Sequence, residues 1–315
     1  MSQVKFSAFA DLHHFPGVFY SRAEERLDFI RKRAEKEQVD FVISLGDFCH
    51  DIYKSAHVLQ QYRDFPMPTY HVFGNHDADE TTYEEVLQAY GLEKDFYSFD
   101  LKGFRFVILN SSYMYKDGEY FNYSKGNYFP HQDKREYFSQ EELDWMQKTL
   151  FESPYPCILF SHASLEREFD GGDGAVHNKE QVMPIIREAN RRCPGKVRMA
   201  INGHMHRNGM SIQENVVYLD LNSSTYDWLP KKHQFFPEEI TKEYNLADHT
   251  VIVNDPVHAV IQLDTDGTIR IDGMKSDYFI GITREMTDNV RYDQAGRPAS
   301  AEVLSVHFKM FYDQQ

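Results

Sequence analysis

The sequence predicts an α/β domain with mixed sheets. Its first half alternates short apolar strand patterns with amphipathic helix patterns, which is typical of this class. Apolar residues make up 41% of the 315 residues, so the chain can bury a substantial core. No internal repeat or low-complexity segment is visible. The tail shows a weaker β pattern, so we expect a main domain over residues 1–275 and a C-terminal β-rich extension over residues 276–315.

The elements of the first half are expected from apolar periodicity and from the residues at their ends. Residues 21–38 have the charged amphipathic pattern of a helix, with Ser21 as its expected N-cap. Lys102-Gly103 is the expected turn of a hairpin. The other expected elements are strands at Val4–Ala10, Phe41–Leu45 and Thr69–Phe73, helices at Ile52–Arg63 and Thr82–Ala89, and hairpin strands at Phe96–Asp100 and Phe104–Leu109.

The second half contains fewer helix patterns. Residues 139–150 predict a helix with a capping box formed by Ser139 and Glu142. Two long irregular stretches, residues 110–138 and 223–255, are rich in aromatic residues, and long loops of this kind are often functional. The other expected elements are a helix at Lys179–Arg192 and strands at Cys157–Phe160, Val197–Ile201, Val216–Leu221, Val257–Leu263, Thr268–Asp272 and Val303–Phe308.

Composition excludes several classes of protein. The formal net charge is −15 and no basic stretch compensates it, so we expect no long nucleic acid as a partner. The three cysteines, Cys49, Cys157 and Cys193, are odd in number and widely spaced, which favours a reducing compartment. No apolar run has membrane-spanning length, and the N-terminal residues lack a signal-peptide pattern. We therefore expect a soluble cytoplasmic protein without a membrane partner, and a homo-oligomer stays open.

Polar residues that can bind metals follow five of the expected strands. Because loops beyond the carboxyl ends of strands converge in α/β sheets, these side chains are expected to meet in one crevice. Carboxylates, imidazoles and one amide oxygen suit a pair of hard-to-borderline metal ions. The five segments are Asp11-Leu12-His13, Gly46-Asp47, Gly74-Asn75-His76-Asp77, Ser161-His162 and Gly203-His204-Met205-His206.

In this order, the motifs D-x-H, G-D, G-N-H-D, H and G-H-x-H resemble those of the calcineurin-like metallophosphoesterase family, over roughly residues 4 to 275. The resemblance implies a four-layer α/β/β/α sandwich of two mixed sheets, with a metal site at the strand carboxyl ends. It makes residues 1–275 the catalytic domain and leaves the role of residues 276–315 open.

The resemblance also implies two metal ions per chain. The first would be bound by Asp11, His13, Asp47 and His206, and the second by Asp47, Asn75, His162 and His204. His76 would lie near the leaving group, and Asp77 would orient it. Purple acid phosphatases differ, since they carry D-x-D and a ligand tyrosine where this chain has His13 and His50. A tyrosine-ligated iron is therefore not expected, and Mn, Fe and Zn all suit these ligands.

The implied activity is hydrolysis of a small phosphate ester. Two metal ions about 3.5–4 Å apart clamp the phosphate and generate a hydroxide that attacks phosphorus. The substrate is expected to be a phosphomonoester or a small phosphodiester, with a cyclic nucleotide or a glycerophosphodiester among the candidates. A protein phosphatase and a non-catalytic metal-binding scaffold of the same fold remain alternatives.

Several neighbouring residues have two interpretations each. His14 and His50 lie beside expected ligands and would support them or face solvent. Arg167 would contact a phosphate oxygen or lie on the surface. His177 and Asn178 would touch substrate or belong to a plain loop. The aromatic residues from 113 to 137 would line the pocket or pack onto the sandwich.

Overall fold

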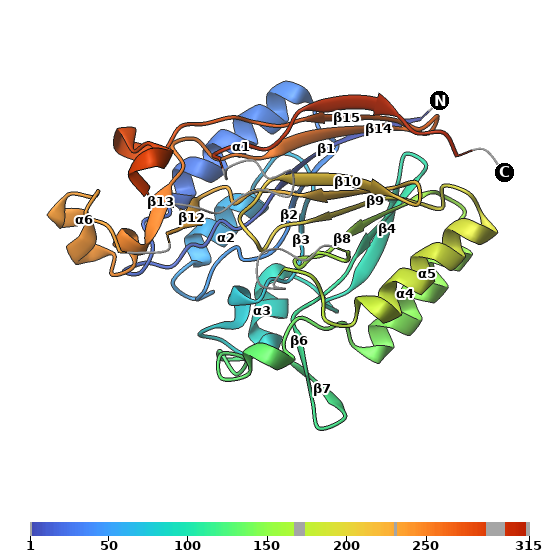
Figure 1. Cartoon of the computed structure of the whole chain (residues 1–315), viewed down its shortest axis with the longest axis horizontal. Coiled ribbons are helices and arrows are strands. Elements are labelled where there is room, and N and C mark those ends of the chain that lie inside the picture. The colour runs from blue at the N-terminus through green and yellow to red at the C-terminus, as the bar shows by residue number, and fades with distance from the viewer. Residues whose placement is uncertain (1, 167–173, 230–231, 288–299, 313–315) are drawn as a thin grey trace.

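Two six-stranded mixed sheets form the centre of the computed structural model, which describes residues 2–166, 174–229, 232–287 and 300–312 (Figure 1). The first sheet has the order β16-β15-β14-β1-β2-β3, and the second has the order β10-β11-β9-β8-β5-β4. The first contains β1 (Gln3–Phe9), β2 (Phe41–Ser44), β3 (Thr69–His71), β14 (Ala259–Asp264), β15 (Thr268–Asp272) and β16 (Val306–Lys309). The second contains β4 (Tyr97–Leu101), β5 (Phe104–Ile108), β8 (Cys157–Phe160), β9 (Val197–Asn202), β10 (Gly209–Gln213) and β11 (Val216–Asp220).

The main apolar core lies between the two sheets. Phe6 of β1 stacks on Phe41 of β2 with ring centroids 4.9 Å apart. The edge of the same ring meets Phe106 and Phe160 of the second sheet, each at 5.7 Å. All four side chains are buried, so these aromatic contacts join the two sheets face to face.

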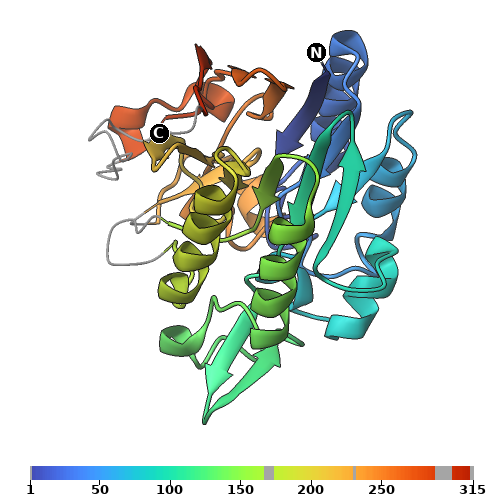
Figure 2. The same ribbon diagram turned by 90° about the vertical axis from the view of Figure 1, so that its right-hand side faces the viewer.

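Helices cover the outer face of each sheet, as Figure 1 and Figure 2 show. Leu27 and Ile30 of α1 belong to one buried cluster with Phe9 and Val42, which point outward from the first sheet. A separate cluster joins α4 and α5 to the second sheet. The helices are α1 (Ala23–Glu37), α2 (Ala56–Arg63) and α3 (Tyr83–Tyr90) on the first sheet and α4 (Gln140–Glu152) and α5 (Lys179–Arg192) on the second. The predicted four-layer α/β/β/α sandwich is confirmed.

Parallel strands bring the metal-binding motifs to one end of the sandwich. β1, β2 and β3 run parallel to one another in the first sheet, as do β5, β8 and β9 in the second. The loops that follow β1, β2, β3, β8 and β9 carry the five motifs. A bridge between Ala10 and Ser223 joins the two sheets at this end. The fold therefore places all five motifs in one region.

The helix ends differ in part from the prediction. Ser21 is not the N-cap of α1, because Arg22 precedes the helix in the left-handed conformation. At α4, Ser139 Oγ accepts a hydrogen bond from Glu142 N, but the Glu142 carboxylate accepts from Asn110 N at 2.7 Å instead of closing the box. A complete capping box forms at α3, between Thr82 and Glu85.

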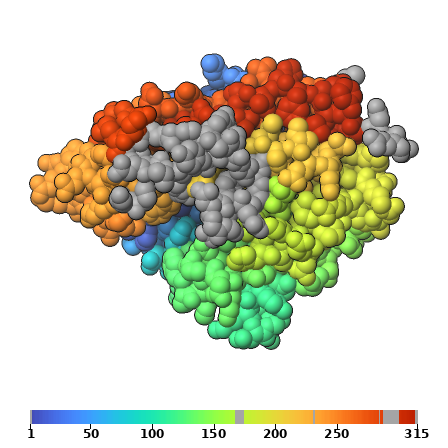
Figure 3. Space-filling view, in the orientation of Figure 1, coloured from blue at the N-terminus to red at the C-terminus, as the bar shows by residue number. Residues whose placement is uncertain are grey.

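The two irregular stretches contain short elements of their own. The first forms a hairpin of β6 (Tyr113–Lys116) and β7 (Glu119–Asn122), which projects from the sandwich in ribbon and space-filling views (Figure 1 and Figure 3). The second contains β12 (Tyr226–Trp228), α6 (Glu238–Glu243) and β13 (Thr250–Ile252). Short 3-10 helices lie at η1 (His76–Ala78), η2 (Gln132–Lys134), η4 (Ala247–His249), η5 (Phe279–Gly281) and η6 (Arg284–Thr287).

The C-terminal segment contributes an edge strand to the sandwich. β16, which lies within the predicted extension, pairs antiparallel with β15 in the first sheet. The division at residue 275 stays a prediction.

Within the part of the chain that the structure describes, no helix combines the length and apolar character needed to cross a bilayer.

Candidate metal centre

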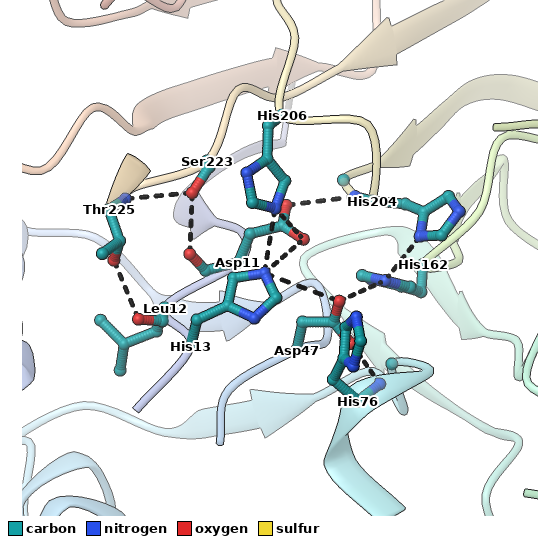
Figure 4. A network of polar contacts seen from close by, with 12 residues as sticks. Asp11, Leu12, His13, Asp47, His76, His162, His204, His206, Ser223 and Thr225 are labelled. Atoms are coloured by element: carbon teal, nitrogen blue, oxygen red, sulfur yellow. Dashed lines mark hydrogen bonds and ion pairs between the residues drawn. The ribbon is translucent and has the colours of Figure 1, made fainter. Parts of the chain in front are cut away.

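The predicted metal ligands converge in two adjoining groups, shown in Figure 4. Asp11, His13 and His206 form one group, and their ligand atoms lie within 4.8 Å of one another. Asp47, His162 and His204 form the other group with the same limit. Six residues from four separate loops therefore point into one centre.

In the first group, two imidazole nitrogens face each other. His13 Nε2 lies 2.9 Å from His206 Nε2. Asp11 Oδ1 lies 3.5 Å from His206 Nε2 and 3.8 Å from His13 Nε2. Nitrogen and carboxylate atoms that converge in this way suit Mn, Fe or Zn.

The second group adds an amide oxygen. His162 Nε2 lies 3.2 Å from His204 Nδ1, 3.1 Å from Asp47 Oδ2 and 3.0 Å from Asn75 Oδ1. Asn75 is buried, and its side chain reaches the group from the loop after β3. The four residues that the family resemblance implies for the second metal ion therefore lie together.

Asp47, a member of the second group, also faces the first group. Its Oδ1 accepts a hydrogen bond from the backbone N–H of His76 at 2.8 Å. Its Oδ2 lies 3.7 Å from His13 Nε2 and 3.1 Å from His162 Nε2, so this oxygen faces both groups. Fixing one oxygen leaves the other in position to bridge two ions.

Asp11 shows that the residues present fit a metal ion. Its Oδ2 accepts a hydrogen bond from His204 N at 3.1 Å. Its Oδ1 is buried and has no hydrogen-bond partner among the described residues. A buried carboxylate oxygen without a partner destabilises the fold, and a bound cation at this atom would remove that cost in free energy.

The second nitrogen of each ligand histidine is also held. His162 Nδ1 donates to the Leu45 carbonyl at 2.8 Å, and His206 Nδ1 donates to the Tyr226 carbonyl at 2.7 Å. Because a carbonyl only accepts, Nε2 of each ring is left with its lone pair toward the centre. The other two contacts are His13 Nδ1 to His50 Nε2 at 2.9 Å and His204 Nε2 to Glu136 Oε1 at 3.5 Å.

The backbone of the centre is strained and closely packed. Five of the seven predicted ligands have positive φ in a non-glycine residue, which costs free energy and clusters at functional sites. A Cβ on Gly74 would lie 2.1 Å from Asp47 N, so only glycine fits beside that ligand. Ser223 Oγ and Thr225 Oγ1 donate to the carbonyls of Asp11 and Leu12, each at 2.9 Å, and hold the first loop (Figure 4). The five strained ligands are Asp11, His13, Asp47, His204 and His206.

The centre concentrates negative charge and attracts cations. Burial opposes the charge of Asp47, but His162 and His76 outweigh it and hold the pKa of Asp47 well below its usual range. Burial lowers the pKa of His162, yet Asp47 reverses the effect and raises it to about 10, so a metal ion at Nε2 would displace a proton. Burial lowers the pKa of His13 and His204 well below the ordinary value, which favours the neutral ring that binds a metal ion.

His76 lies beside the centre and contacts Asp79. His76 Nδ1 lies 2.8 Å from Asp79 Oδ2. Burial lowers the pKa of His76, but the carboxylates of Asp79 and Asp47 outweigh burial and raise it to about 9. The hydroxyl of Tyr128 donates to Asp79 Oδ1 at 2.7 Å, and His50 Nδ1 lies 2.7 Å from Asp79 Oδ2. One buried carboxylate thus holds three neighbouring side chains.

Asp77 does not orient His76, contrary to the prediction. Its Oδ1 accepts hydrogen bonds from Phe48 N at 2.8 Å and Cys49 N at 3.2 Å, and its Oδ2 accepts from Gly74 N at 2.7 Å. The turn of η1 directs Asp77 inward, under the loops that carry the ligands, and places Asp79 next to His76. Asp77 therefore braces the two loops that follow β2 and β3.

The remaining predicted candidates divide between the centre and its surroundings. His50 is buried against His13 and supports that ligand, whereas His14 contacts Ser55. Asn178 holds the chain at Phe138, and His177 lies in the same loop with its N–H donating to the Glu136 carbonyl. Arg167 lies outside the described residues, so its predicted phosphate contact stays a prediction.

The sequence interpretation missed three residues at the centre, Asp79, Tyr128 and Glu136. Asp79 is one of 49 acidic residues, and its spacing from His76 carries no distinct signal. Tyr128 lies in the aromatic stretch that the sequence offers as a pocket wall, but its hydrogen bond to Asp79 has no signal in the sequence. Its neighbour Phe129 is exposed, with its ring 6.3 Å from the His76 ring. Glu136 lies 3.5 Å from His204 Nε2, and it also forms an ion pair with the adjacent Arg135 at 2.9 Å. No motif in the sequence marks it.

Comparisons with known proteins agree with this fold. None of the curated proteins matches the chain well enough to count as a relative. A dimetal phosphatase from Danio rerio superposes with a TM-score of 0.60 at 16% sequence identity, covering 87% of this chain and 96% of that chain. GAP50, the anchor in the inner membrane complex of Plasmodium, superposes with a TM-score of 0.56 at 12% identity, covering 100% and 90%. The profile of the calcineurin-like phosphoesterases matches residues 4–208, and the chain belongs to that family.

Proposed function

We propose that this chain hydrolyses a small phosphate ester with two divalent metal ions. The chain belongs to the calcineurin-like phosphoesterases, and a dimetal phosphatase has a similar fold, which supports the proposal. Asp11, His13, Asp47 and His206 would bind the first ion, and Asp47, Asn75, His162 and His204 the second. The observation that carries the proposal is the position of Asp47 Oδ2, at 3.7 Å from His13 Nε2 and 3.1 Å from His162 Nε2. Mn, Fe and Zn all suit these ligands.

Two bound ions would neutralise the phosphate charge and supply a hydroxide at neutral pH. His76 would then assist departure of the leaving oxygen. Because Nδ1 of His76 is engaged by Asp79, Nε2 is the nitrogen left to donate a proton or a hydrogen bond. Asp79 fixes the ring orientation, and Tyr128 fixes Asp79. The chain's contribution is positioning of the ions and of one acid.

A small substrate is favoured over a long polyanion. The net charge of −15 disfavours binding of a nucleic acid backbone. The exposed ring of Phe129, which lies near His76 and packs on Tyr128 at 4.5 Å, offers an apolar surface to the leaving group of an ester. We therefore propose a phosphomonoester or a small phosphodiester as the substrate.

Hydrolysis of a nitrophenyl monoester and a bis-nitrophenyl diester tests the proposal. With added Mn²⁺, the wild type should turn over one of them, and Asp47→Asn should lower turnover by more than about 100-fold, because both ions lose a ligand. Asp144→Asn, at an exposed position on α4, is the matched control. Turnover that survives in Asp47→Asn, or its absence in wild type carrying two Mn²⁺ per chain, would overturn the proposal. The faster ester assigns the enzyme to monoesterases or diesterases.

A further inference from the structure

A second group of metal-binding side chains lies apart from the dinuclear centre. Its members are His14, in the loop after β1, Glu24, in the first turn of α1, and His57, in the first turn of α2. One ligand atom from each lies within 4.8 Å of the other two. None of the three belongs to the ligands assigned to the dinuclear centre, and the mechanism above uses none of them.

His14 is held in a fixed orientation. Its ring is buried, and Nδ1 lies 2.8 Å from the hydroxyl of Ser55, a fully buried residue. That contact leaves Nε2 as the nitrogen available to a metal ion. The backbone N–H of His14 donates to the Phe48 carbonyl at 3.0 Å, so the main chain is fixed as well. A ligand that is already ordered loses little entropy when an ion binds.

Glu24 and His57 reach the same point from two different helices. His57 Nε2 lies 2.8 Å from Glu24 Oε1. Gln61, one turn after His57 on α2, donates to the Glu24 carbonyl at 2.9 Å and fixes the two helices relative to each other. The side chains of Glu24 and His57 are 52% and 57% exposed, so an ion can enter from solvent. One buried imidazole and two solvent-accessible side chains thus form a set of three ligands that is open to solvent on one side.

We propose that His14, Glu24 and His57 form a third metal site, which binds a zinc-like divalent ion. Two imidazoles and one carboxylate with water as the fourth ligand make a tetrahedral set that Zn²⁺ accepts. The bound ion links the first turns of α1 and α2 to the loop that carries His13. The site is independent of the proposed hydrolysis. Its ion stabilises the loop after β1, which carries ligands of the dinuclear centre.

Counting zinc per chain in the full-length protein tests this site. After equilibration with buffered free Zn²⁺, the wild type should hold three ions, whereas His57→Ala and Glu24→Gln should each hold two. His307→Ala, at an exposed position on strand β16, should keep three. Zn²⁺ bound at the third site should also raise the melting temperature of the wild type above that of His57→Ala, because an ion that binds only the folded state stabilises it.

The possible counts separate this inference from the proposed function. Two ions in both the wild type and His57→Ala would overturn the third site and leave the dinuclear centre intact. One ion in the wild type and none in His57→Ala would support the third site and contradict the dinuclear centre. If Glu24→Gln keeps the wild-type count while His57→Ala loses an ion, Glu24 is not a ligand and the proposed set is wrong.

Discussion

Asp79 Oδ2 lies 2.8 Å from Nδ1 of His76 and 2.7 Å from Nδ1 of His50. His50 Nε2 in turn lies 2.9 Å from Nδ1 of His13. Since the carboxylate accepts from both rings, Nδ1 of His50 carries a proton and Nε2 accepts from His13. One carboxylate therefore sets the orientation of a proposed metal ligand, through His50, and of the proposed acid.

Replacing Asp79 should affect esters according to their leaving groups. In Asp79→Asn, His76 loses its orienting carboxylate, so turnover of an alkyl phosphate ester should fall by about 10²–10³-fold, within the range of general acid catalysis. A nitrophenyl ester, whose leaving group needs little protonation, should lose less than about tenfold. Steady-state kinetics on both esters checks this difference.

Asp77→Asn is the control for that experiment. The Asp77 carboxylate accepts three backbone hydrogen bonds, none of them from the His76 ring, so its loss should lower the melting temperature and slow both esters by similar factors. An equal loss for both esters in Asp79→Asn would contradict the role given to Asp79.

Replacing His50 should lower the affinity for one metal ion more than for the other. His50→Gln removes the partner that holds the His13 ring, and loss of such a partner typically costs about 10–100-fold in metal affinity. The ion bound by His162 and His204 should be retained, because Leu45 and Glu136 hold those rings. A metal titration in a competing chelator measures the two affinities, with His258→Gln as a remote buried control. An equal loss of affinity for both ions would contradict the role of His50 as the support of His13.

Acid should destabilise the fold through His258. This ring is fully buried, and Nδ1 donates to the Pro256 carbonyl at 2.6 Å. Burial, with Arg33 nearby, lowers the pKa of His258 from 6.5 to about 3. Between pH 6.5 and about 3, His258 is protonated in the unfolded chain and neutral in the folded chain. The free energy of unfolding therefore falls as the pH drops from 7.5 to 5.

The expected size of this effect is about 2 kcal/mol between those two pH values. His258→Gln should lack that part of the pH dependence, whereas His307→Gln, at an exposed position, should keep it. Urea unfolding at both pH values in one metal buffer measures the difference. A His258→Gln chain that loses as much stability in acid as the wild type would show that His258 does not contribute.

The α/β class and the ligand positions follow from local signals in the sequence, whereas the four-layer arrangement follows from the resemblance to the family. Apolar strands followed by Asp11, Asp47 and His162 place ligands at the carboxyl ends of parallel strands, and those ends meet in any such sheet. Gly74 precedes Asn75 because a Cβ there would collide with Asp47 N at 2.1 Å. Motif order and strand position therefore determine where these residues lie.

The support around the ligands depends on contacts between distant loops. Asp79 meets His50 and Tyr128 only because the segments after β2, η1 and β7 pack together, and no spacing in the sequence encodes that packing. The resemblance to the family gives the orienting role to Asp77, because the G-N-H-D motif ends at that residue. The turn of η1 decides which of the two carboxylates faces the ring.

Turnover as a function of bound metal tests the central claim most directly. Metal-free His57→Ala, in which the proposed third site is removed, is titrated with Mn²⁺ while hydrolysis of the faster nitrophenyl ester is followed. Since Asp47 is proposed to bridge two ions that act together, activity should stay near zero until the first equivalent is bound and rise to a plateau at the second. Full activity at one equivalent, or activity in the metal-free chain, would contradict the two-metal account.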